Sequence, residues 1–151
     1  MTDLITEIDQ KEIPQIKLYK DKSMYAVAFF GGPLAAGYII AENFKALNDR
    51  ERYKKTWFIT IAVCVFIFGG IFMIPDSVNV PNYIIPIIYS YLAFYLIRHY
   101  QGKQIDEHIS NGGKTYSGWR SALIGLIALV ITIVVLFSII FLVLLTQGRL
   151  Q

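Results

Sequence analysis

The chain has 151 residues, of which 55% are hydrophobic, 15% aromatic and 17% charged, and its mean hydropathy is +0.49. Soluble domains typically have ~45–50% apolar and ~25% charged residues, so this composition favours a protein partly surrounded by lipid. It excludes a disordered chain, a collagen-like chain and a disulfide scaffold. The formal charge of +3 is too small to predict a nucleic-acid partner, and a single cysteine, Cys64, allows no disulfide within the chain.

Four hydrophobic segments follow one another along the chain, and each approaches or exceeds the ~20 residues that a membrane-spanning helix needs. They cover about residues 24–44, 57–74, 80–99 and 121–146. The second and fourth contain no Asp, Glu, Lys, Arg or His, and they lack the periodic polar face of a helix in a soluble protein. We therefore predict an all-α integral membrane protein. Its parts are a polar N-terminal tail over 1–23, one helical membrane domain over 24–146 and a short C-terminal tail over 147–151.

The first segment is interrupted near its middle by Gly31-Gly32-Pro33. Proline favours the first turn of a helix, and glycine supplies conformational freedom just before it. Pro33 can therefore open a second helix that ends at Asn48, in which case the segment enters and leaves the membrane on the same side. The alternative is a spanning helix with a proline kink, which membrane helices tolerate. The sequence leaves both arrangements open.

The 14 Lys and Arg residues are unevenly distributed. Five lie in the loop over 45–56 and four in the loop over 98–120, whereas the loop PDSVNVPN has none. Cytoplasmic flanks are enriched in Lys and Arg, so we expect loops 45–56 and 98–120 to be cytoplasmic. If all four segments span, nine basic residues lie inside and five outside. If the first segment re-enters, the division is thirteen to one.

Glu42 and Asn43 are the only strongly polar pair that adjoins a hydrophobic run on its interior side. Polar groups in a membrane are costly and suggest a functional site, although Glu42 can also pair with Lys45 at position i+3. We group this pair with the glycine–proline break as a candidate functional turn. Its members are Gly31, Gly32, Pro33, Glu42 and Asn43.

Other polar residues do not form a recognisable chemical site. His99, Asp106, Glu107 and His108 lack the spacing of metal ligands. Residues 112–115 (GGKT) lack the first glycine of a phosphate-binding loop and are expected to form a turn. Because no arrangement supports nucleophilic or acid–base catalysis, we expect no enzyme, no catalytic residue, no cofactor and no metal.

Small residues recur at helical spacing in two segments. In the last segment they form a candidate helix-packing stripe, and in the first they include Ala28 and Ala36. The stripe consists of Ser121, Gly125, Ala128 and Thr132. Because small residues let membrane helices approach closely, these faces predict helix contacts within the chain, with a second copy or with another protein.

Two stretches carry a resemblance to other proteins. Ile16-Lys17-Leu18-Tyr19 and FFGGPLAAGYIIAENFKAL (residues 29–47) together resemble a segment of small bacterial polytopic membrane proteins of uncharacterised function. The resemblance covers about a fifth of the chain. It implies a bacterial cytoplasmic (inner) membrane and assigns no activity to any residue.

We therefore expect a non-enzymatic integral membrane subunit or anchor that packs within a larger membrane complex. Its expected partners are the lipid bilayer and a protein, or a second copy, that packs against the small-residue helix faces; nucleic acid is not expected. The alternative is a small oligomeric channel or transporter in which the Gly31-Gly32-Pro33 turn lines the path.

Overall fold

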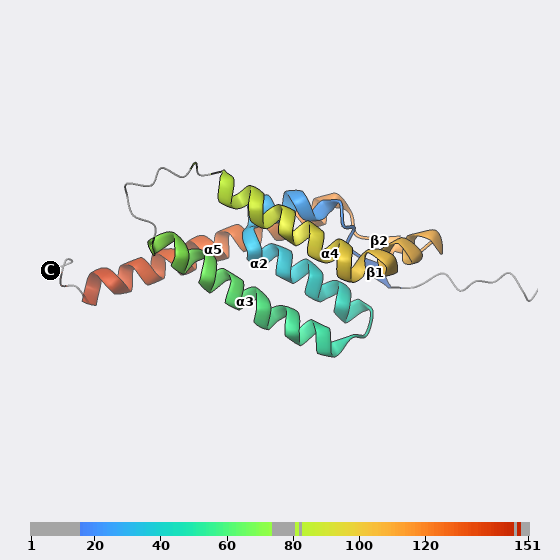
Figure 1. The fold of residues 1–151 in the computed structure, drawn as a ribbon, viewed down its shortest axis with the longest axis horizontal. Coiled ribbons are helices and arrows are strands. Elements are labelled where there is room, and N and C mark those ends of the chain that lie inside the picture. The colour runs from blue at the N-terminus through green and yellow to red at the C-terminus, as the bar shows by residue number, and fades with distance from the viewer. Residues whose placement is uncertain (1–15, 74–80, 82, 147, 149–151) are drawn as a thin grey trace, which may run out of the picture.

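The computed structural model describes residues 16–73, 81, 83–146 and 148. Within this part of the chain, each of the four hydrophobic segments lies in a helix, so the predicted all-helical fold is confirmed (Figure 1). The helices are α2 (Ser23–Ala46), α3 (Arg50–Met73), α4 (Ile84–Ser110) and α5 (Gly118–Thr146). Two short strands, β1 (Lys17–Leu18) and β2 (Lys114–Thr115), complete the elements of the described chain.

Two helices extend well beyond the hydrophobic segments that predicted them. Helix α3 begins at Arg50, before the segment's first residue Trp57, and α4 continues through the charged residues to Ser110. Lys, Arg, Glu and Gln are good helix formers, so the helices continue after the hydrophobic run has ended.

Several predicted tail and loop residues lie outside the described part of the chain, namely 1–15, 74–80, 82, 147 and 149–151.

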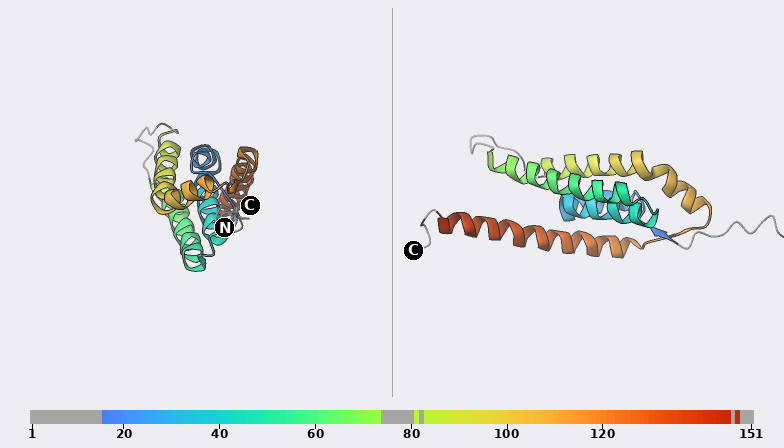
Figure 2. Two further views of the ribbon diagram at one scale, coloured as in Figure 1. Left: turned by 90° about the vertical axis from the view of Figure 1, so that its right-hand side faces the viewer. Right: turned by 90° about the horizontal axis from the view of Figure 1, so that it is seen from below.

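Helix α2 lies at the centre of the molecule. It packs against α3, α4 and α5, with α5 on one side and α3 and α4 on the other (Figure 2). The buried apolar core is correspondingly centred on α2, which contributes Met24, Val27, Ala35 and Ile39 among others. The other three helices therefore depend on α2 for their packing.

The chain reverses direction within α2. Gly32 has φ 70° and ψ −171°, which divides the element into helices over residues 23–31 and 33–46. A straight helix of this length would place its ends about 36 Å apart, because each residue adds ~1.5 Å. Instead the N–H of Tyr19, just before the first half, donates to Oδ1 of Asn43 in the second half at 2.8 Å. The segment just before α2 therefore contacts the second half of α2 near its end, and the two halves run in opposite directions (Figure 1).

Short, well-capped connections join the helices at this same end. Between α2 and α3, Asn48 adopts a positive φ of 60°, and Asp49 Oδ1 accepts the N–H of Arg52 at 2.9 Å. After α4, Gly112 has φ 75° and lies in the predicted turn, whereas Lys114 and Thr115, which were also expected in the turn, form β2. The turn leads into β2, which pairs in parallel with β1 through Lys17 and Lys114. The N-terminal segment therefore lies beside the α4–α5 connection.

Among the described residues, three helices are long and apolar enough to cross a membrane: α2, residues 50–70 of α3, and α5. Their length and composition are consistent with an integral membrane protein. In α2, however, the length is divided between two halves that fold back on each other, so its total length does not measure the distance that it covers.

Candidate functional site

A buried polar network lies where the two ends of α2 meet. Asn43 is completely buried. Its Nδ2 donates to the carbonyl oxygen of Tyr19 and to Oε1 of Gln101, both at 3.1 Å, while its Oδ1 accepts the N–H of Tyr19. Gln101, which is also completely buried, donates through Nε2 to the carbonyl of Ile40 at 2.8 Å. The Asn43–Gln101 pair thus joins the N-terminal segment, α2 and α4.

Arg98, three residues before Gln101 on α4, makes two ion pairs nearer the surface. Its guanidinium lies 2.9 Å from a carboxylate oxygen of Asp21 and 3.0 Å from one of Asp106. Because the Arg98 side chain is about half exposed, each pair contributes little free energy. Their geometric effect is to hold the start of α2 against α4.

Arg120 connects the N-terminal segment with α5. Its Nε donates to the phenolic oxygen of Tyr19 at 3.0 Å, and its guanidinium lies over the ring of Tyr116 at 4.3 Å from the centroid. Burial raises the pKa of the Tyr19 phenol, and the Arg120 hydrogen bond only partly opposes this effect. The phenol is therefore neutral at physiological pH and accepts this hydrogen bond as an uncharged group.

The histidines have different positions and do not form a metal centre. His108 is buried, and its Nε2 lies 2.9 Å from the carbonyl oxygen of Lys114, which ties the end of α4 to β2. His99 is exposed and stacks on Tyr95. Within the described residues, no group of three His, Cys, Asp or Glu side chains is arranged to hold a metal ion.

The five residues of the candidate functional turn do not come together. Gly31, Gly32 and Pro33 form the chain reversal, whereas Asn43 lies ten residues further along the second half, or about 15 Å away. Glu42 pairs with Lys45 at 3.3 Å, which is the structural alternative that the sequence allowed. The reversal and the polar network are therefore two separate features at opposite ends of one half-helix.

The predicted packing stripe on α5 faces α2. Ser121, Gly125 and Ala128 are buried, and a Cβ atom added to Gly31 would lie 2.6 Å from the Cα of Gly125. Thr132, the last member of the stripe, is partly buried, and its hydroxyl donates to the carbonyl of Ala128. This small-residue face thus has a packing partner within the chain.

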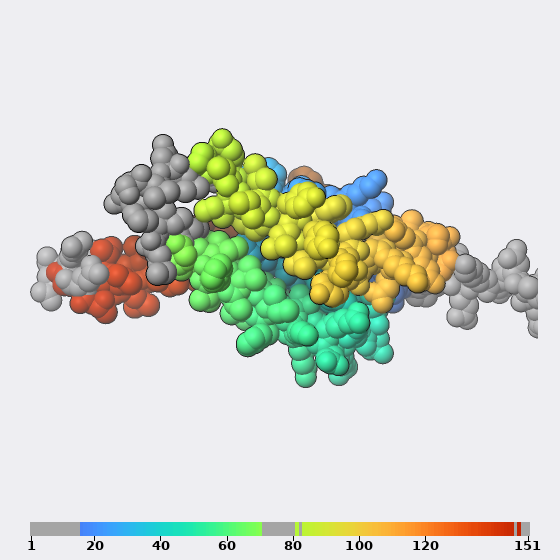
Figure 3. Space-filling view, in the orientation of Figure 1, coloured from blue at the N-terminus to red at the C-terminus, as the bar shows by residue number. Residues whose placement is uncertain are grey.

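A groove of about 500 Å³ lies between the second half of α2, α3 and α4. We call it the interhelical groove; part of α2 is visible between α3 and α4 in Figure 3. Its walls are mainly apolar, with Ile59, Val63 and Leu96 among the lining residues. Arg52 and Lys55 line one end, near the start of α3. No motif in the sequence predicted this groove, because its lining comes from three different helices.

The sequence pattern identified Asn43 but missed its partners. Gln101 lies beyond the charged residue Arg98, outside the hydrophobic segment, so nothing marked it as buried. Tyr19 belongs to the stretch that carries the resemblance, but no other sequence feature marks it, and strands of two residues are too short to give an alternating pattern. The available signal was weak: a glutamine on the face of α4 that also carries Ala93, Ile97 and Ile105.

The polar groups of the network are largely engaged with one another. Among the buried side chains that the structure describes, only the hydroxyl of Ser90 lacks a hydrogen-bond partner. The arrangement therefore holds chain segments together at one end of the helices.

No protein-family model matches the chain, and no curated protein or solved structure is significantly similar to it.

Proposed function

We propose that α3, α4 and α5 span a membrane and that α2 is a re-entrant helical hairpin. The halves of α2, over 23–31 and 33–46, have lengths of about 13 and 21 Å, shorter than the ~30 Å hydrocarbon core. The contact between Tyr19 and Asn43 supports entry and exit on the same side. Helix α4 is less apolar than the other two, and its apolar stretch from Ile84 to Ile97 covers only about 21 Å. Unlike the halves of α2, however, α4 has 27 residues and a total length of about 40 Å, which is enough to cross the core.

The charge distribution supports a cytoplasmic location for the end with the polar network. The N-terminal segment, the α2–α3 connection and the α4–α5 connection all lie there (Figure 1). With this arrangement thirteen of the 14 Lys and Arg residues are cytoplasmic, and only Arg149 is on the other side. Cytoplasmic enrichment of Lys and Arg is the general rule for membrane proteins. Together with the sequence resemblance, it supports placement in a bacterial inner membrane.

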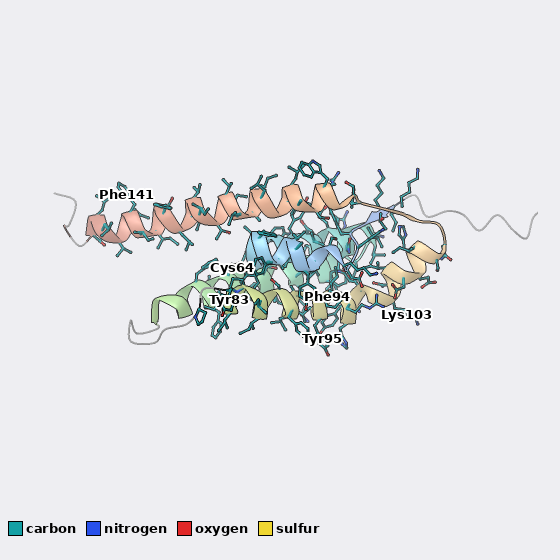
Figure 4. The ribbon with its side chains drawn as sticks, turned by 90° about the horizontal axis from the view of Figure 1, so that it is seen from above. Cys64, Tyr83, Phe94, Tyr95, Lys103 and Phe141 are labelled. Carbon is teal, nitrogen blue, oxygen red and sulfur yellow. The ribbon has the colours of Figure 1, made fainter. Side chains whose placement is uncertain are left out.

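Within that membrane, the chain acts as a non-enzymatic subunit or anchor that packs in a larger complex. One observation carries this proposal: among the described residues, the buried side chains of α5 all lie in its first third and end at Ala128. Most of the following stretch to Thr146 is apolar and exposed. Figure 4 shows Phe141 on the part of α5 that extends beyond α2. This apolar length provides a surface on which a helix of another subunit packs.

A photo-reactive phenylalanine analogue introduced at Phe141 tests the proposal. Irradiation of native membranes, followed by purification in a mild detergent, should give a discrete protein adduct and a stoichiometric partner. The matched control is the same analogue at Phe66 of α3, which is 82% exposed and should react mainly with lipid. Repeated isolation of the chain alone, with only lipid adducts at Phe141, would contradict the proposal.

We do not adopt the channel or transporter alternative, because no specific observation favours it. Pro33 lines the interhelical groove, but most of the described lining is apolar, and Glu42 is paired with Lys45 at the end of α2. An ion path needs polar groups along its length to replace the water lost by the ion. Ion flux through reconstituted protein that Pro33→Ala alters would restore this alternative.

A further inference from the structure

We infer that the interhelical groove is a binding site for one anionic glycerophospholipid, with its headgroup at Arg52 and Lys55 and an acyl chain along the groove. The shape of the groove fits such a ligand. Helices α3 and α4 both pack on α2, but across the described residues they make little contact with each other. They therefore leave a concave space of about 500 Å³ that opens between two helices. Ligand sites typically have volumes of ~300–1,000 Å³ and mostly apolar walls.

The lining of the groove changes from basic at one end to apolar along the rest of its length. On α3 the lining runs from Arg52 and Lys55 through Thr56 to Val63 and Ile67. This stretch is about 22 Å long, because it rises ~1.5 Å per residue. One leaflet of the hydrocarbon core is about 15 Å thick, half of the ~30 Å total. The groove is therefore long enough for one acyl chain, and its basic residues are at one end only.

The positive charges of Arg52 and Lys55 favour an anionic headgroup at this end of the groove. Among the described residues, Lys55 has no ionic partner, and Arg52 pairs only with Asp49, which lies just before the start of α3, at 3.3 Å. The guanidinium of Arg52 also lies 5.8 Å from the ring centroid of Phe44, which lines the same end of the groove. Basic pockets between membrane helices on the cytoplasmic side are suited to anionic headgroups. A phosphodiester at this end would complement both basic side chains.

These features favour a lipid over a helix from another protein. A helix would need a wide apolar surface, whereas the groove lies between two helices and has two cations at one end. A zwitterionic lipid would satisfy the apolar walls equally well, but its positive group would oppose Arg52 and Lys55. The inference therefore predicts selectivity for negative charge, which unspecific coating of a membrane protein by lipid does not produce.

Native mass spectrometry of the full chain, released from detergent, tests the assignment. Phosphatidylglycerol and phosphatidylcholine are added separately at equal concentrations, and lipid-bound and lipid-free chains are counted. We expect one phosphatidylglycerol per chain, bound several-fold more tightly than phosphatidylcholine. The double variant Arg52→Gln/Lys55→Gln should weaken phosphatidylglycerol binding roughly tenfold or more, because each basic residue attracts an anionic lipid. Equal binding of the two lipids by the unmodified chain would overturn the assignment.

Two matched controls locate the lipid within the groove. Arg50→Gln/Lys54→Gln removes the same charge from the same turn of α3, but neither residue lines the groove, so binding should be unchanged. Val63→Phe fills the apolar part and should abolish binding, whereas Ile61→Phe on the exposed face of α3 should not. An equal loss in both double variants, or full binding by Val63→Phe, would show that lipid binds at the loop surface and would contradict the proposal.

Discussion

At the scale of single residues, Asn43 carries the contact between the two ends of α2. Its amide oxygen and nitrogen both have partners, and one of them is the backbone of a residue 24 positions earlier. Burial of an amide is costly unless it is hydrogen-bonded, and here each polar atom is engaged. Asn43 therefore serves as a connector between segments, and its carbonyl oxygen is already occupied by the N–H of Tyr19.

Removal of this side chain should destabilise the protein. Asn43→Ala leaves the N–H of Tyr19 and the amide of Gln101 without their partner, so the free energy of unfolding should fall by about 1–3 kcal/mol. Unfolding in mixed micelles with increasing sodium dodecyl sulfate measures this change. The neighbouring variant Glu42→Gln loses only an exposed ion pair and should cost less than about 1 kcal/mol. Similar losses for both variants would show that the network is not what holds the ends together.

A second prediction at this scale concerns the close contact between α2 and α5. In Gly31→Ala the new Cβ would lie 2.6 Å from the Cα of Gly125, a backbone atom, so α5 must move. Overpacking of this kind costs about 1–3 kcal/mol. In Gly125→Ala the nearest atom to the new Cβ is 3.6 Å away, which is an ordinary contact, and stability should be nearly unchanged. The same unfolding measurement distinguishes the Gly31→Ala and Gly125→Ala variants. An equal effect of the two substitutions would contradict the described packing.

At the scale of elements, the reversal in α2 depends on the backbone of Gly32. A positive φ combined with an extended ψ is essentially restricted to glycine, and Gly32→Ala should cost about 1–3 kcal/mol. No atom lies within 4 Å of the added Cβ, so the loss comes from the backbone conformation and not from a steric contact. Gly69→Ala, a helical position of α3 with equally open surroundings, is the control and should be neutral or slightly stabilising. A fully stable Gly32→Ala protein would argue against the reversal.

The sequence predicted the helices well because long apolar runs and the Gly-Gly-Pro break are local signals. It did not distinguish a reversal from a kink, because that choice depends on the contact of Tyr19 with Asn43, across 24 positions. The hydrophobic segment from residue 57 did not indicate where α3 begins, since hydropathy predicts which residues lie in lipid and not where a helix starts. Charged residues between Arg50 and Lys55 continue the helix into the polar region.

The candidate site was only partly predictable for a similar reason. Asn43 can be singled out from the sequence because it adjoins an apolar run, and in the structure it is buried. Gln101 and the pairing of Lys17 with Lys114 follow from tertiary contacts between distant segments and leave no periodic pattern. The interhelical groove likewise depends on how α3 and α4 diverge over α2, which no single segment encodes.

At the scale of the whole molecule, the fold separates a polar end from an apolar body. The net charge of +3 conceals this separation, because it averages over basic residues gathered near one end of the helices. The two connections, the paired strands and the Asn43 network all lie at that end. The reversal of α2 is what brings the N-terminal segment there, so the orientation of the entire chain in the membrane depends on it.

Cysteine accessibility tests this central claim most directly. With Cys64 replaced by serine, single cysteines are introduced at Lys20, before α2, and at Asn48, after it; both positions are exposed. Gly148→Cys, beyond α5, provides a reference for the opposite side. The account predicts that a membrane-impermeant maleimide labels Gly148→Cys in intact cells, but labels Lys20→Cys and Asn48→Cys only after permeabilisation. Labelling of Lys20→Cys from outside, with Asn48→Cys still protected, would show that α2 crosses the membrane and would contradict the account.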